Sequence, residues 1–564
     1  MEQIAFGYYS TMSWLFNGAA RKLQGVTVIA RTISNSSCHH LPSLAPLNVF
    51  NTYHRNVQVV PLDMSNDAPT LREIIQLTRQ ELTNRHEFDA IRECGRAALA
   101  LLTEDIELGL KLAYQKLHDV PYKEVKTCWR RLYTDASLWK VLKLVGDQHG
   151  QPSTTGSEEQ RDTREKNASI DDVVRTLDMT LILTGAPERE ELVELWFAAL
   201  RAALTPPEPH LDIETSERSN KRRKLSSSLQ SSHIRTSFPT VLPDPSPTLR
   251  HAIPRANELS LEAFQKRLSD MTMHTPVIIE GAIQHWPALE ERPWSDPGYL
   301  LEQTLGGRRL IPVEVGKSYT DEGWGQRITT FRDFMETYML KGQADIVPTA
   351  SHTDGTDGTS QPYSDKNTPI PTGYLAQHDL FAQIPSLRAD ISIPDYCYCE
   401  PAPSPHLAHV KPVAKLEEPL LNAWFGPAGT VSPLHTDPYH NILAQVVGYK
   451  YVRLYAPGET ERLYPRSVDE SGVDMSNTSR VDLDEAMAVW PGISCWEGER
   501  VCGDDEKEVL YERRRAFEEE FPSFKDARYV EGILAPGECL YLPVGWWHYI
   551  RSLTPSFSVS FWFN

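Results

Sequence analysis

The chain has 564 residues, of which 40% are hydrophobic and 24% are charged, and its formal net charge is −19. This length exceeds what one hydrophobic core supports and predicts two or three domains. The negative charge argues against direct nucleic-acid binding and favours basic protein partners, and since no run of about 18 apolar residues occurs, no membrane helix is predicted.

Residues 1–70 are predicted to form a poorly ordered N-terminal extension. No acidic residue occurs between Glu2 and Asp63, and serine and threonine are frequent. This composition resembles an organelle transit peptide. Simple disorder is an alternative, as is a gene model that starts too early, with the true start at Met64. The sequence leaves these three interpretations open.

Residues 71–204 carry apolar residues at helical spacing, which predicts an all-α domain of five to seven helices. Two of the helices are expected at 171–184 and 187–204, after a polar break at 146–167. No catalytic constellation occurs in this region, so a separate role for it would be contact with partners.

Residues 205–250 are rich in proline, serine and glutamate and are predicted to be a disordered linker. The linker contains a compact basic cluster, Lys221, Arg222, Arg223 and Lys224. Such a cluster is typical of a nuclear localisation signal, although a solvated charge run is the alternative. The eight scattered cysteines are typical of reduced thiols, which fits a nuclear or a cytoplasmic protein.

Residues 255–564 read mainly as short strands separated by glycine and proline turns, which predicts a β-sandwich or barrel. Helices are expected at 259–268 and 331–340. Two segments interrupt the pattern: a flexible insert at 345–372, and an insert at 484–527 with a charged, helical part at 508–521. We expect the second insert to be an inert surface addition. Strands are predicted at 276–282, 309–316, 374–375, 422–425, 442–447, 449–455, 532–534, 538–542, 547–552 and 557–562.

A candidate metal site lies in this strand-rich region. His435 and Asp437 form an H-x-D sequence flanked by apolar runs, and side chains at i and i+2 of an extended segment point the same way. His548 near the C-terminus is the predicted third ligand. Two histidines and one carboxylate form the facial triad of non-haem Fe(II) oxygenases. A second H-T-D at 352–354 lies in a segment of loop composition, and we interpret it as chance.

Several longer stretches resemble one family. They are NAWFGPAGTVSPLHTDPYHN at 422–441, QVVGYKYVRLYAP at 445–457 and TPSFSVSFWFN at 554–564. These stretches are similar to JmjC-domain oxygenases, and more narrowly to the lysine-specific demethylase 8-like group, over residues 261–564. The resemblance implies a double-stranded β-helix of the cupin class at 255–564. The expected fold class is therefore α+β multidomain, with the all-α domain first.

The resemblance also implies Fe(II) at the triad, with 2-oxoglutarate and O2 as co-substrates. The position of Lys450 within the family-like sequence implies that it binds the far carboxylate of 2-oxoglutarate. The alternative is a surface lysine at a hairpin. The other residues implied for this site are Tyr374, Ser432, Asn441 and Trp562. An arginine substrate would require a carboxylate and an aromatic wall. The implied substrate-binding residues are Glu314, Tyr319 and Trp424, against the alternatives of an outward strand residue for Glu314 and a core aromatic for Trp424.

The predicted function is Fe(II)- and 2-oxoglutarate-dependent hydroxylation of protein side chains, with arginine as the side chain the subgroup implies. The protein or peptide substrate is expected to be basic, such as a histone. Histone lysine demethylation stays open, as does a catalytically silent JmjC fold that serves as a binding module. No zinc or chromatin-reader module is visible in the sequence, which favours hydroxylation. The sequence does not indicate the oligomeric state.

Overall fold

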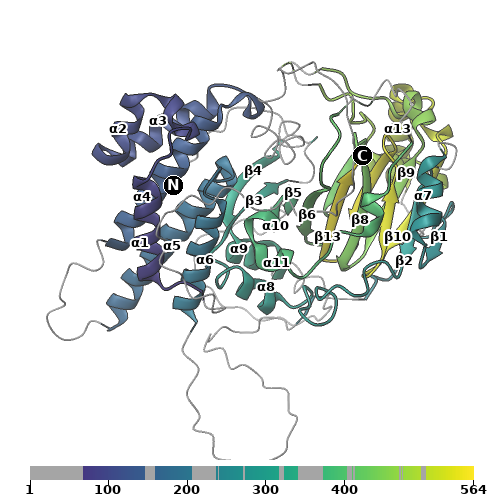
Figure 1. Cartoon of the computed structure of the whole chain (residues 1–564). Helices are drawn as coiled ribbons and strands as arrows, with labels where there is room; N and C mark the ends of the chain where they lie inside the picture. Colours follow the sequence, from purple (N-terminus) through teal and green to yellow (C-terminus); the bar gives the residue numbers. More distant parts are fainter. Residues whose placement is uncertain are drawn as a thin grey trace, which may run out of the picture.

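The computed structural model describes residues 68–146, 159–205, 237–238, 241–270, 274–316, 320, 323–340, 372–402, 410, 413–468, 472, 474–496 and 504–564. Helices dominate one side of the molecule and two β-sheets the other (Figure 1). The predicted order of a helical region followed by a sheet-rich region is confirmed. The expectations for residues 1–63, for the basic cluster at 221–224, for the H-T-D at 352–354 and for Tyr319 lie outside the described residues.

The helical region forms where apolar residues recur at helical spacing. Thr70 caps its first helix, because its side chain accepts from the Glu73 amide while the Glu73 carboxylate accepts from the Thr70 amide. The predicted helix at 171–184 begins earlier, at Glu159, so the polar residues after 158 are helical rather than a break. The helices are α1 (Leu71–Thr83), α2 (Arg96–Glu104), α3 (Ile106–His118), α4 (Thr127–Gly146), α5 (Glu159–Thr184) and α6 (Glu190–Leu204).

Two sheets build the second region. The larger has nine strands in the order β1-β2-β11-β8-β13-β6-β5-β3-β4, and the smaller has the order β10-β9-β12-β7. The predicted strands all occur, while β1, β4 and β7 were not predicted as strands. The bounds are β1 (Arg255–Asn257), β2 (Val277–Glu280), β3 (Leu310–Val315), β4 (Gly325–Thr330), β5 (Gly373–His378), β6 (Leu420–Gly426), β7 (Val431–His435), β8 (His440–Val447), β9 (Lys450–Tyr455), β10 (Tyr529–Leu534), β11 (Cys539–Leu542), β12 (Trp547–Ser552) and β13 (Ser556–Phe563).

Strand alternation decides which side chains face the site. On β13, Phe557, Val559 and Phe561 belong to the core between the large sheet and its covering helices. The intervening residues therefore face the space between the two sheets. A second core, which includes Leu443, Val452 and Leu540, fills part of that space. The described residues of this region thus form the two facing sheets of a double-stranded β-helix.

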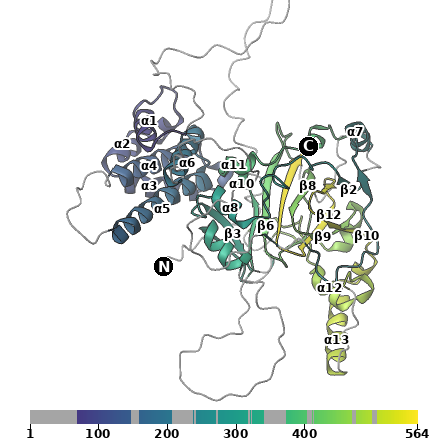
Figure 2. The same ribbon diagram turned by 90° about the horizontal axis from the view of Figure 1, so that it is seen from below.

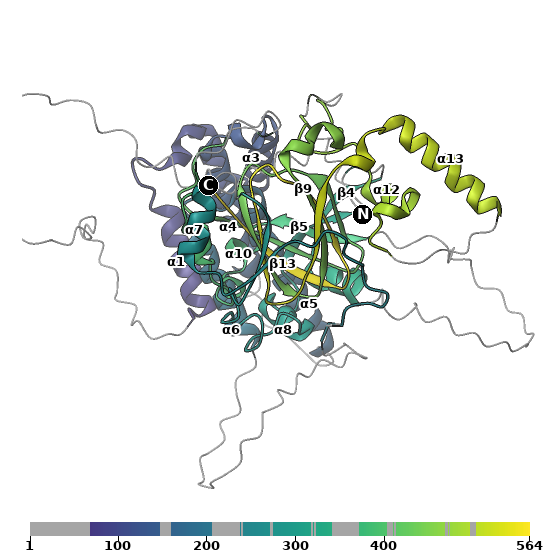
Figure 3. The same ribbon diagram turned by 90° about the vertical axis from the view of Figure 1, so that its right-hand side faces the viewer.

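Further helices cover the sheets: α7 (Leu261–Ser269), α8 (Pro297–Gln303), α9 (Phe331–Phe334), a π-helical turn (Met335–Leu340), α10 (Leu380–Gln383) and α11 (Pro385–Arg388). The insert at 484–527 supplies most of α12 (Leu483–Val489) and all of α13 (Asp504–Glu520). Part of α13 projects from the molecule (Figures 2 and 3). Its last turn and the residues that follow it do not, since Phe517, Phe521 and Phe524 are buried against the outer face of the small sheet. The expectation of an inert surface addition is wrong for this part, because these aromatic rings complete a core.

The predicted linker also differs from its expectation near its end. Phe238 is buried in the core of the large sheet, and its amide donates to the Ser295 carbonyl. The Arg250 amide donates to the Glu531 carboxylate at 2.6 Å. The described residues between 237 and 250 therefore pack against the sheet region. Among the described helices, none is both long and apolar enough to cross a membrane.

Candidate metal and co-substrate site

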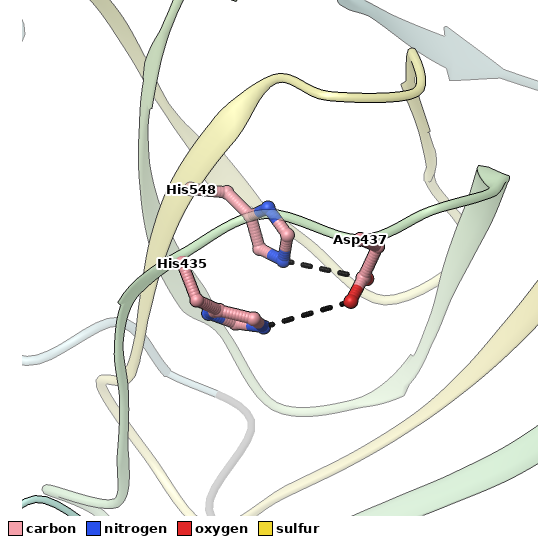
Figure 4. A group of neighbouring side chains, drawn as sticks. All are labelled: His435, Asp437 and His548. Atoms are coloured by element: carbon pink, nitrogen blue, oxygen red, sulfur yellow. Dashed lines mark ion pairs between the residues drawn. The ribbon is translucent and has the colours of Figure 1, made fainter. Parts of the chain in front are cut away.

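Three side chains from two distant parts of the sequence meet at the mouth of the two sheets. His435 ends β7, Asp437 follows it, and His548 lies on β12, which pairs with β7 so that the two histidines are opposite each other. The Asp437 carboxylate oxygens lie 3.9 Å from His435 Nε2 and 3.6 Å from His548 Nε2. The three side chains point toward one centre (Figure 4). One atom from each lies within 4.8 Å of the others, so the predicted triad is assembled.

A β-bulge aims His435 into the site. His548 pairs with His435 and Ile550 pairs with Ser432, so β7 spans three residues where β12 spans two. One extra residue in a strand changes the face to which its neighbours point. Ser432 and His435 therefore lie opposite residues that face the interior, although strict alternation along β7 would separate them.

Backbone carbonyls orient both imidazoles. His435 Nδ1 donates to the Pro433 carbonyl at 2.7 Å, and His548 Nδ1 donates to the Trp546 carbonyl at 3.1 Å. With the proton on Nδ1, each Nε2 presents its lone pair toward Asp437, which is the tautomer a metal ligand requires. Burial lowers the pKa of His548 and so favours its neutral form.

Burial also raises the pKa of the Asp437 carboxyl, and the neighbouring His435 only partly opposes that effect. A divalent cation between the three groups would supply the missing positive charge. Two neutral imidazoles and one carboxylate on one side leave the opposite coordination positions open, as Fe(II) oxygenases need. The residues present fit an Fe(II) ion.

The insert at 484–527 braces the strand that carries His548. The Asp484 carboxylate accepts from the Tyr549 hydroxyl at 2.6 Å and from Arg551 Nη1 at 2.8 Å. Tyr549 lies in the core on the outer face of the small sheet, so the contact holds β12 from the side opposite the triad. The insert therefore contributes to the rigidity of the site, a role that its charged composition did not indicate.

Lys450, which is predicted to bind the co-substrate, is buried. It starts β9, is 2% exposed, and donates to the Tyr374 hydroxyl at 3.2 Å. Among the described residues no carboxylate forms an ion pair with it, and burial alone lowers its pKa to about 7. A buried ammonium without a counter-ion is expensive, so this position favours an anionic ligand. The alternative of a surface lysine is wrong.

The remaining predicted co-substrate residues lie on β7, β8 and β13. Ser432 hydrogen-bonds Tyr374, whose ring has room because Gly426 lacks a Cβ, which would lie 2.7 Å from the ring. Asn441 and Trp562 are directly paired on neighbouring strands and face the interior. Asn441 Oδ1 and Trp562 Nε1 are buried without a hydrogen-bond partner among the described residues. Such groups usually have a partner, which a bound polar ligand or water would provide.

Two of the three predicted substrate residues lie beside this site. Glu314 is opposite Tyr374 on adjacent strands, and burial raises its pKa to about 7. Trp424 packs 6.0 Å from the Tyr374 ring, centroid to centroid, and donates to Ser560, so it also fits its alternative as a core aromatic. A small pocket opens next to them, lined by Glu314, Gly316, Trp324, Thr372, Tyr374, Thr430 and Val431.

The sequence interpretation missed Trp324, which donates to the Glu314 carboxylate at 3.4 Å. Its only signal was its place five residues after Tyr319 in a glycine-rich turn. The Asp484 brace and the histidine-orienting carbonyls were also missed. Backbone carbonyls have no signature in the sequence.

Comparison with known proteins agrees with this geometry. Residues 261–564 match the model of the cupin-like domain family. The chain is 33% identical over 509 residues to lysine-specific demethylase 8 of Danio rerio, covering 90% of this chain and 96% of that protein. The chain belongs to the JmjC oxygenases of the lysine-specific demethylase 8 group. JmjC oxygenases use Fe(II) and 2-oxoglutarate, and so does this one.

Two other relatives show the range of the family. Lysine-specific demethylase JMJ30 of Arabidopsis thaliana is 33% identical over 476 residues, which cover 81% of this JmjC protein and 85% of the relative. The human bifunctional peptidase and (3S)-lysyl hydroxylase JMJD7 is 25% identical over 293 residues, or 51% of this chain and 77% of the relative. The names of these relatives thus include both demethylation and hydroxylation.

Proposed function

We propose that this JmjC oxygenase hydroxylates protein side chains and that its preferred side chain is arginine. The proposal rests chiefly on the Glu314 carboxylate, which shares a small pocket with Tyr374 and Trp324. A guanidinium can pair with a carboxylate and stack on aromatic rings at the same time. In a methylated lysine, methyl groups replace N–H donors, so fewer hydrogen bonds to a carboxylate are possible. Glu314 therefore favours arginine.

We assign each residue of the site a task in this reaction. Bound iron and 2-oxoglutarate supply the oxidising chemistry. His435, Asp437 and His548 would hold the metal. Lys450 and Tyr374 would bind the far carboxylate of 2-oxoglutarate, Ser432 and Asn441 would add hydrogen bonds, and Trp562 would wall off water. Glu314, Trp424 and, from the sequence alone, Tyr319 would bind the substrate.

The direct test combines the purified protein, Fe(II), 2-oxoglutarate and peptides that contain arginine, lysine or methylated lysine. We expect succinate to form and the arginine peptide to gain the mass of one oxygen atom. Loss of a methyl group from a methyl-lysine peptide would instead support demethylation, which the names of two relatives favour. Absence of succinate with every peptide would support the silent binding module.

Replacing Glu314 by glutamine tests the substrate pocket. We expect the KM for the arginine peptide to rise about 10- to 100-fold, because a charged hydrogen bond contributes roughly 1.5–3 kcal/mol. Since burial raises the pKa of Glu314 to about 7, the carboxylate is protonated below that pH. Peptide affinity of the unsubstituted protein should therefore increase as the pH rises through 7, and the variant should lack this dependence.

Glu336→Gln is the matched control, since Glu336 is exposed and lies outside the pocket. Steady-state kinetics at several pH values measure both variants. An unchanged KM for the peptide in Glu314→Gln would contradict the arginine assignment while leaving the oxygenase chemistry intact.

We also propose a nuclear location with a basic protein as partner. The support is the sequence cluster Lys221, Arg222, Arg223 and Lys224 together with the net charge of −19. A fluorescent fusion with the four residues replaced by alanine should move to the cytoplasm if the cluster is the signal.

A further inference from the structure

A buried ion pair joins the helical region to the sheet region. Asp178 on α5 is fully buried, and Arg309, directly before β3, is 2% exposed. Arg309 Nη2 lies 2.7 Å from Asp178 Oδ1, and Arg309 Nε lies 2.9 and 3.0 Å from the two carboxylate oxygens. The guanidinium also stacks 3.5 Å from the ring centroid of Phe197 on α6. This is a bidentate contact with defined geometry.

Asp178 binds more than the guanidinium. Its Oδ2 accepts the amide of Leu310, the first residue of β3, at 2.7 Å. Its Oδ1 accepts from Gln383 Nε2 at 2.7 Å. The same Gln383 amide group donates to the Leu310 carbonyl at 2.7 Å, and Gln383 Oε1 lies 2.7 Å from His378 Nε2 at the end of β5. Asp178 therefore anchors the start of β3 directly and the end of β5 through Gln383.

This anchor replaces strand pairing. The ladder between β3 and β5 has two residue pairs, Glu314 with Tyr374 and Val315 with Gly373, both at the pocket end. At the other end the strands are connected through Gln383 and Asp178. There β5 also has a register shift against β6, and Gln377 has a φ of 47°. Such a bulged, strained segment persists only where its surroundings hold it.

We propose that Asp178 is a positioning residue for the oxygenase pocket, so that the helical region is part of the working enzyme. The inference rests on the proposed roles of Tyr374 and Glu314. These two residues lie about 13 Å along the strands from the anchor, at a rise of about 3.3 Å per residue. Release of the anchor lets β3 and β5 shift relative to each other, which displaces both pocket residues. The two triad histidines lie on β7 and β12 in the other sheet, where the pairing of these strands holds them.

Asp178→Asn in the full chain tests the inference. We expect 2-oxoglutarate affinity, measured by calorimetry with Mn(II) bound, to fall about tenfold or more, because small misplacements of binding groups have effects of that size. Mn(II) affinity should change by less than about twofold. Amide hydrogen exchange should become faster in 310–315 and 373–378 but not in β7 or β12.

A double variant, Asp178→Leu with Arg309→Met, guards against simple unfolding. Replacing both partners of a buried pair with apolar residues usually preserves stability, while this variant also removes the anchor for Leu310 and Gln383. We expect the variant to fold with a somewhat lower melting temperature, because the buried Leu310 amide loses its acceptor, and to bind 2-oxoglutarate more weakly. Unchanged binding and unchanged exchange in this folded variant would overturn the proposal.

Asp135→Asn is the matched control within the helical region. Asp135 is equally buried and pairs with Arg131 at 3.3 Å and with Arg189 at 3.5 Å, all within that region. The control should melt at a lower temperature and bind 2-oxoglutarate normally; equal weakening would refute positioning by Asp178. Hydrogen exchange is measured without co-substrate, so it tests the Asp178 anchor independently of 2-oxoglutarate binding. Failure of the unsubstituted chain to bind 2-oxoglutarate would instead refute the proposed function.

Discussion

Asp437→Ala is expected to lower succinate formation at least about 1,000-fold, since a metal centre contributes several kcal/mol to the chemical step and each 1.4 kcal/mol is tenfold in rate. Asp437 supplies the only carboxylate of the assembled triad. Without it, two neutral imidazoles remain, which bind a hard divalent cation weakly. Mn(II) titration should show the loss of affinity directly.

The fold of this variant should persist. Burial raises the pKa of Asp437, which means that the charged carboxylate is disfavoured at its position when no cation compensates. Alanine removes that cost, so the melting temperature without metal should stay the same or rise. Circular dichroism measures it.

The chain offers a matched control in its second H-T-D. Asp354→Ala changes the same residue type in the same tripeptide, and we expect normal turnover and normal Mn(II) affinity. A variant at 437 that retained turnover would remove the metal assignment. Loss of turnover at 354 would show that the tripeptide at 352–354 is not a chance occurrence.

Lys450→Met is expected to raise the KM for 2-oxoglutarate about 10- to 100-fold, because a charged hydrogen bond contributes roughly 1.5–3 kcal/mol. The pKa of Lys450 is lowered from 10.5 to about 7. The ammonium binds a carboxylate but the neutral amine does not. The KM of the unsubstituted enzyme should therefore rise as the pH increases above 7, and the variant should lack that dependence.

Lys450→Met should weaken co-substrate binding but stabilise the fold when no co-substrate is bound. Because the folded-state pKa of Lys450 lies below the unfolded value, the unfolded chain binds more protons between pH 7 and 10.5, so this residue destabilises the fold most below pH 7. Lys450→Met should raise the melting temperature at pH 6, and the gain should shrink as the pH approaches 10.5. Lys415→Met is the control, because Lys415 is exposed and pairs only with the exposed Glu400 among the described residues. It should change neither the KM for 2-oxoglutarate nor the melting temperature. A variant with normal KM and unchanged stability would refute the co-substrate role.

Most of the sheet region was predictable from local pattern. Alternation and turn residues indicated the strands, and the apolar flanks of His435 and Asp437 separated this H-x-D from the copy at 352–354. Resemblance to the family, rather than local pattern, indicated a co-substrate role for Lys450, since an isolated lysine at the start of a strand is usually exposed. The insert at 484–527 was misjudged, because charge dominates its composition while a few aromatic residues bury its last turn.

The sequence by itself determined the chemistry: which side chains can bind Fe(II), and which strands have a face for them to share. The tertiary structure alone decided the geometry. The bulge in β7, the pairing of His435 with His548, and the Asp178 anchor all depend on contacts between residues far apart in the chain. Local periodicity cannot encode such contacts, because register and domain packing are set by the burial of complementary surfaces after the strands have formed.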